Sequence, residues 1–124
     1  MTANGTLRVV VARTGRPLAL AARMARGVVA RAVGLLGRRA LQEGEALVFE
    51  RCNSIHTVGM RFPIDAVFVD RSWRVVALRP GLVPGRVVLP VSGAWGVLEL
   101  ASGTVQQSGL QEGDQLDLLE ANHV

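Results

Sequence analysis

Short apolar runs bounded by turn residues dominate this chain, and they predict a mainly β protein. The predicted strands are 7–13, 45–49, 64–70, 73–78, 96–100 and 115–119. Two residues, Arg71 and Ser72, separate the third run from the fourth, which predicts an antiparallel hairpin because two residues can reverse the chain. Residues 79–93 contain three prolines and three glycines, so we expect a loop there with at most a short edge strand.

Three other segments are less regular. Alanine and leucine in residues 18–25 favour helix by propensity. The short turn over 14–17 nevertheless makes a strand, paired as a hairpin with the first run, the preferred prediction. Residues 28–37 place apolar side chains on one helical face and end at a glycine, so we predict a helix. Residues 102–109 predict a single helical turn.

About seven short strands and one helix are typical of a mostly antiparallel sandwich or barrel. The 124 residues fit a single domain, 1–124, with a core over about residues 6–120. Hydrophobic residues make up 49% and charged residues 19%, a soluble globular composition. We expect a cytoplasmic protein with no signal peptide, and no apolar run approaches the roughly 20 residues that a membrane span needs.

Charge is distributed unevenly along the chain. Residues 1–42 contain eight arginines and no acidic residue, whereas residues 43–124 contain six arginines and ten acidic residues. A basic face for nucleic acid or anionic lipid, or a transit peptide, is one interpretation. These arginines are, however, spread through apolar segments, and no aromatic residue precedes Phe49 to stack on bases. We therefore favour a solvated basic surface over a nucleic-acid or membrane contact.

The segment 52–65 concentrates the candidate chemistry. Cys52, the only cysteine, is followed at intervals of four by His56 and Met60, a set of soft ligands that suits copper. Residues four apart on a strand lie about 13 Å from each other, which is too far to share a metal ion. A helix would bring them closer, but Gly59 disfavours one. We expect no metal and no cofactor here, and a lone cysteine forms no internal disulfide.

A nucleophile and base pair is a second interpretation of this segment. A turn at Asn53 and Ser54 can fold His56 back towards Cys52, and a thiol needs such a base to become a nucleophile. The sequence shows no residue that would orient the imidazole. The favoured interpretation is a buried cysteine that packs as a small hydrophobe, with the histidine in a polar network.

Asp65 and Glu99 each lie in an otherwise apolar strand. A carboxylate that faces a core must be paired or protonated. Two such acids can carry out general acid and base chemistry, but an ion pair with Arg31 or Arg61 is the favoured account. We predict that Arg31 contacts at least one of the two carboxylates.

Several segments together resemble the uncharacterised DUF192 family, also called UPF0127. They are Arg31–Arg38, Cys52–Thr57, Met60–Asp65, Val97–Leu100, Gly109 and Gly113-Asp114. The resemblance implies a compact, mainly β domain of jelly-roll or barrel character with a helix packed across it. It implies no reaction. Many relatives have a tryptophan-methionine pair where this chain has Val58-Gly59-Met60.

The sequence therefore predicts a non-catalytic binding or accessory domain, because polar and soft residues gather in one loop of an apolar β scaffold. A small ligand or a protein would bind in a cleft near this loop. The expected binding residues are Cys52, Ser54, His56, Met60, Asp65 and Glu99. The first alternative is a thiol- or acid/base-dependent enzyme that uses Cys52, His56 and Asp65. The second is a basic-face binder of nucleic acid or an anionic surface.

Overall fold

The computed structural model describes residues 6–25 and 41–120, in which strands predominate. The strands are β1 (Thr6–Val11), β2 (Pro17–Met24), β3 (Glu45–Glu50), β4 (Ile55–His56), β5 (Ile64–Val69), β6 (Val75–Leu82), β7 (Val87–Val88), β8 (Gly96–Ala101) and β9 (Leu116–Glu120), and the helix is α2 (Thr104–Ser108). The predicted mainly β fold is confirmed. The helix predicted over 28–37, with Arg31, lies outside the described residues.

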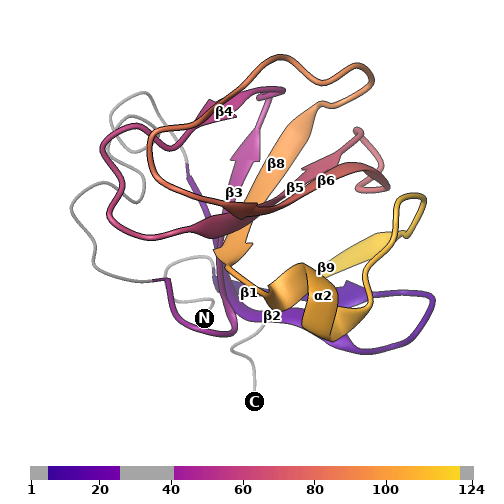
Figure 1. The fold of residues 1–124 in the computed structure, drawn as a ribbon. Coiled ribbons are helices and arrows are strands. Elements are labelled where there is room, and N and C mark those ends of the chain that lie inside the picture. The colour runs from indigo at the N-terminus through magenta and orange to yellow at the C-terminus, as the bar shows by residue number, and fades with distance from the viewer. Residues whose placement is uncertain (1–5, 26–40, 121–124) are drawn as a thin grey trace.

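Seven strands form one sheet in the order β6-β5-β8-β3-β2-β1-β9. Neighbours are antiparallel except β2 and β3, which are parallel. The sheet curls into a half-barrel (Figure 1), and its two edges meet where Arg74 bridges Gln115. At the same place the amide of Leu116 donates to the carbonyl of Trp73 at 3.0 Å. These contacts join the edge strands β6 and β9 at one end.

The ambiguous segment 18–25 is a strand, as preferred. β2 pairs antiparallel with β1, and the chain reverses at Gly15, whose φ of 71° suits a residue without Cβ. Leu18 and Ala22 of β2 are buried in the interior of the half-barrel. Burial of these side chains overrides the helix preference of alanine and leucine, which amounts to only tenths of a kcal/mol per residue.

Strand β5 is buried on both faces, which explains its continuous apolar run. Val67 and Val69 belong to the interior cluster of the half-barrel, together with Leu98 and Leu100 of β8. The alternate residues of β5, including Phe68, pack on the outer face of the sheet. The two-stranded sheet β4-β7 and its connecting loops lie over that outer face (Figure 1). We call β4, β7 and the loops 51–63 and 83–95 the outer layer.

Apart from shifts of one or two residues at strand ends, the structure differs from the sequence predictions at three places. The β5–β6 connection includes Trp73, with φ 66°, so it is longer than the predicted two residues. Strand β6 continues through Pro80 into the predicted loop. It lies at the edge of the sheet, where one side has no neighbouring strand, so a residue without a backbone N–H can be accommodated there. Strand β4 was not predicted, since two residues are too few for a periodic pattern.

The helix α2 covers one end of the half-barrel, where it contacts β2 and β6 (Figure 1). Its Val105 and the following Leu110 belong to the interior cluster. Gly103 and Gly109 flank the helix with φ of 96° and 70°. Within the described residues there is no helix with the length and apolarity needed to cross a membrane.

Candidate functional site

A buried threonine, which sequence reasoning did not single out, organises the segment 52–65. Thr57 is 0% exposed. Its hydroxyl donates to the carbonyl of Val83 at 2.7 Å and accepts from the amide of Arg86 at 2.8 Å. Its carbonyl accepts from the amides of Gly85 at 3.0 Å and Met60 at 3.1 Å. The side chain and backbone of one residue therefore join the two loops of the outer layer. The signal available in the sequence is its place in the segment Cys52–Thr57, which resembles the DUF192 family.

Cys52 is half-buried and its thiol is engaged. The Sγ–H group donates to the carbonyl of Ser54 at 3.0 Å, and the Cys52 amide donates to the carbonyl of Trp95 at 2.8 Å. The side chain packs against the apolar cluster that contains Phe49. This environment supports the interpretation of Cys52 as a small buried hydrophobe.

The three residues spaced by four have different surroundings. His56 is exposed on β4, opposite Val87 of β7. Met60 is 8% exposed and packs with Phe62 and Ile64. The described part of the chain contains no group of three or more histidine, cysteine, aspartate or glutamate residues that could hold a metal ion.

Asp65 is 0% exposed and accepts hydrogen bonds from three backbone amides. Its Oδ1 accepts from Gly81 at 2.8 Å, and its Oδ2 accepts from Gly103 at 3.1 Å and Val105 at 2.8 Å. Gly103 is the N-cap of α2 and has no side chain to cap it. Asp65 therefore supplies from β5 the acceptor that an N-cap side chain normally provides.

Glu99 lies on the opposite face of the sheet from Asp65. Asp65 is in register with Leu100, whereas Glu99 is in register with Ala66. Consecutive residues of a strand point to opposite faces, so the two carboxylates are separated by the sheet. The interpretation that these two acids form a catalytic pair is therefore wrong.

Burial raises the pKa of Glu99 from its ordinary 4.5 to about 7. The side chain is 6% exposed, and within residues 6–25 and 41–120 it has no hydrogen bond or ion pair. Its cross-strand row contains Ala66 and Arg79 on one side and Leu47 and Arg23 on the other. Arg31 lies outside the described residues, so the contact predicted for it stays a prediction. Of the two acids Glu99 is the candidate for that contact, because backbone amides already satisfy Asp65.

Exposed aliphatic side chains gather in the outer layer. They are Val58, Val83, Val87 and Leu89, with exposed fractions of 53%, 44%, 66% and 75%. We call these four residues the outer patch. The hydrogen bonds of Thr57 hold the loops of Val58 and Val83 together, and Val87 pairs with His56. Exposed apolar residues that lie together mark interaction surfaces more often than single ones do.

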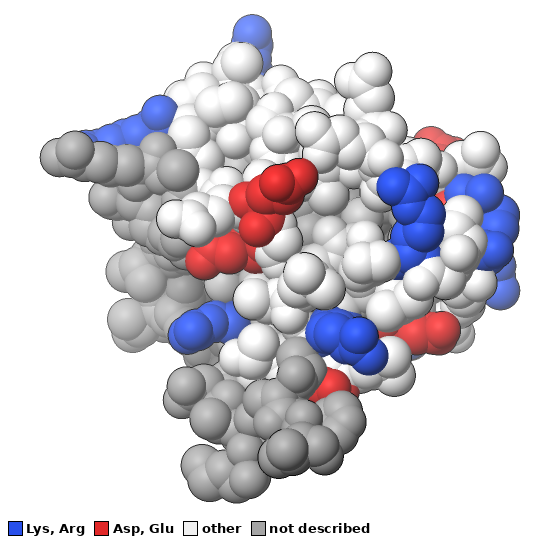
Figure 2. Space-filling model, turned by 90° about the horizontal axis from the view of Figure 1, so that it is seen from below, with Lys and Arg blue, Asp and Glu red and all other residues white. Residues whose placement is uncertain are grey.

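The outer layer is also free of acidic residues. No aspartate or glutamate occurs in 51–63 or in 83–95, although these two stretches contain three arginines, Arg51, Arg61 and Arg86. The underside of the molecule differs, because acidic and basic side chains are interspersed there (Figure 2). The outer patch thus lies on chain segments that contain basic but no acidic residues.

Two solved structures share this fold. One is a protein of unknown function from Novosphingobium aromaticivorans DSM 12444, with 26% identity, a TM-score of 0.76, and coverage of 90% of this chain and 83% of that one. The other is a candidate transcription regulator from Sinorhizobium meliloti 1021, with 24% identity, a TM-score of 0.77, and coverage of 90% and 91%. No curated protein matches the chain at a significant level. The model of the DUF192 family, described as "Uncharacterized ACR", matches residues 9–118, and the chain therefore belongs to the DUF192 family.

Proposed function

We propose that this chain is a non-catalytic binding domain that recognises an acidic protein surface through the outer patch. The observation that carries the proposal is the combination of four exposed aliphatic side chains with acid-free, arginine-containing segments. Arginine is enriched in protein interfaces, where its planar guanidinium pairs with carboxylates. Complementary charge also raises the association rate with an acidic partner.

The outer patch is held in a defined shape before any partner arrives. The Thr57 hydroxyl and backbone fix the loops of Val58 and Val83, and strand β7 positions Val87. A surface that is already ordered loses less conformational entropy when it binds. This rigidity supports a recognition surface.

The thiol-dependent enzyme is the alternative, and the hydrogen bonds of two of its candidate residues argue against it. The Cys52 thiol donates to Ser54, and the Asp65 carboxylate accepts from three amides beneath α2. A catalytic acid or base must reach the proton that it transfers. Asp65 is buried and bonded to backbone amides, so its role in this proposal is structural.

The binding proposal can be tested with a displayed library of short random peptides selected on the intact protein. We expect enriched peptides in which aspartate or glutamate flanks aliphatic residues. Binding of these peptides should fall in the double variant Val87→Asp/Leu89→Asp and with rising salt, because salt screens charge attraction. The matched control is Leu119→Asp, which alters a 43% exposed leucine on β9, outside the outer layer.

Equal loss in the Leu119→Asp control would overturn the proposal, as would enrichment of basic peptides. Vesicles of anionic and of neutral lipid provide a second arm. Binding to anionic vesicles that requires Val87 and Leu89, without any peptide enrichment, would assign the outer patch to a membrane surface instead. Thermal melting of each variant confirms that it is folded.

A further inference from the structure

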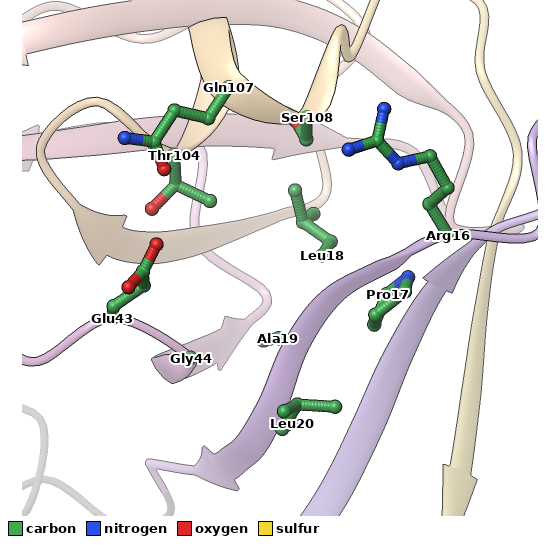
Figure 3. A pocket seen from close by; sticks show the side chains of 10 residues that line it. All are labelled: Arg16, Pro17, Leu18, Ala19, Leu20, Glu43, Gly44, Thr104, Gln107 and Ser108. Carbon is green, nitrogen blue, oxygen red and sulfur yellow. The ribbon is translucent and has the colours of Figure 1, made fainter.

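A separate cavity lies on the far side of the sheet from the outer layer, between the start of β2, the turn before β3 and the helix α2. Its volume is about 350 Å³. The residues that line it are Arg16, Pro17, Leu18, Ala19, Leu20, Glu43, Gly44, Thr104, Gln107 and Ser108 (Figure 3). Three chain segments that are remote in sequence thus form one concave surface.

Opposite charges stand at the two sides of this cavity. Arg16 lies on one side of Leu18 and Glu43 on the other (Figure 3). The ion pair within the described residues joins Arg13 to Asp114, so neither Arg16 nor Glu43 takes part in it. One guanidinium and one carboxylate are therefore available to a ligand.

The floor between these charges is apolar. Leu18 and Ala19 are buried, whereas Leu20 is 56% exposed and offers apolar surface to a ligand. Thr104 and Ser108 already donate to carbonyls of their own chain at 2.7 Å and 3.1 Å. The Ser108 oxygen also accepts from the amide of Leu110 at 3.3 Å. The Thr104 oxygen and the side-chain amide of Gln107 remain as polar groups along the helix side of the cavity.

We propose that this cavity binds an aliphatic dipeptide, a zwitterion with an apolar body. A peptide unit separates the terminal ammonium and carboxylate of a dipeptide, so they can face opposite sides of the cavity, whereas those of a free amino acid share one carbon. The ligand carboxylate pairs with Arg16, its ammonium group pairs with Glu43, and its side chain covers Leu20. Ligand cavities usually measure about 300–1,000 Å³, so this one suits a ligand at the small end of that range. The assignment is independent of the outer patch, because the two surfaces share no residue.

Leucylleucine is a suitable probe, with calorimetry and amide chemical shifts as readouts. N-acetyl-leucylleucine lacks the ammonium group and leucylleucinamide lacks the carboxylate, so each removes one of the two proposed contacts. Free leucine is a further control, because its two charges share one carbon. We expect leucylleucine to bind and to shift the amides of residues 18–20, 43–44 and 104–108. Both modified dipeptides should bind about tenfold more weakly or worse, the factor for losing one charge-assisted hydrogen bond.

Matched variants assign each charge. Arg16→Gln should abolish the preference for leucylleucine over leucylleucinamide, and Glu43→Gln should abolish the preference over N-acetyl-leucylleucine. Arg8→Gln and Glu112→Gln are the controls, because both alter exposed charges that do not line the cavity. Absence of any leucylleucine binding at millimolar concentration would overturn the proposal. Equal binding of all analogues, or equal effects of the control variants, would also overturn it.

Discussion

The Asp65 carboxylate accepts a hydrogen bond from the amide of Val105 at 2.8 Å, across 40 positions of sequence. The same carboxylate accepts from Gly81 and Gly103, so one buried acid joins β5, β6 and the beginning of α2. One side chain thereby provides the acceptor for three backbone amides that have none within a helix or strand pairing. The contact makes Asp65 a structural acid.

Replacing Asp65 by alanine should strand these buried amides. We expect Asp65→Ala to lower the free energy of unfolding by about 3 kcal/mol, because each unsatisfied buried donor costs roughly 1–3 kcal/mol and solvent partly compensates. Urea unfolding measures the loss, and amide hydrogen exchange at Gly103 and Val105 should accelerate. Asp117→Ala removes an exposed acid of β9 and is the control. A variant as stable as this control would contradict the assignment.

Glu99 should make the fold less stable as pH rises. Its pKa is raised from 4.5 to about 7 in the folded protein, so the folded state retains a proton that the unfolded state releases. The stabilisation is complete below pH 4.5 and is lost as pH rises towards about 7. At roughly 1.4 kcal/mol per pKa unit, the change is about 3 kcal/mol.

The variant Glu99→Gln should remove this dependence and stabilise the protein above neutral pH. Urea unfolding at about pH 5 and about pH 8 measures both effects, with Glu112→Gln as an exposed control. A different outcome is that the wild type keeps its stability as pH rises, whereas Arg31→Ala loses stability. That outcome would show that Glu99 is ionised and paired with Arg31. In that case Arg31→Ala should cost about 2–4 kcal/mol at neutral pH, because it strands a buried charge.

Thr57 should be required for both the stability and the binding of the outer layer. Thr57→Val keeps the shape of the side chain but leaves the amide of Arg86 without its acceptor and the carbonyl of Val83 without its donor. We expect a loss of about 2 kcal/mol, measured by thermal or urea unfolding. Thr57→Ser retains the hydroxyl and should lose less. A larger loss in Thr57→Ser than in Thr57→Val would show that the methyl group, rather than the hydrogen bonds, matters at this position.

The thiol of Cys52 should react slowly with iodoacetamide near neutral pH. It is half-buried and donates to Ser54, whereas reactive cysteines have an accessible thiolate. The alkylation rate should lie below that of a model thiol and rise to that level in urea. A rate above the model thiol in the folded protein would instead favour the thiol-dependent enzyme, and His56→Ala should then lower it.

The strands and the family were accessible from sequence because their signals are local. The apolar runs of β5 and β8 and the turn at Gly15 each lie within a few residues, and the family segments occur in order. Side-chain alternation also assigns each acid to one face of its own strand. Alternation does not give the register between neighbouring strands. The register of β5 with β8 is what places Asp65 and Glu99 on opposite faces of the sheet.

The candidate sites depended on contacts that carry no sequence signature. Backbone amides are present at every non-proline residue, so nothing marked Gly81 or Val105 as the partner of Asp65. The outer patch and the cavity between Arg16 and Glu43 likewise combine segments that only the folded chain brings together. The sequence determined which residues form strands because hydrophobic periodicity is a property of neighbours. The tertiary structure decided which polar groups meet, because curling of the sheet sets the distances between remote segments.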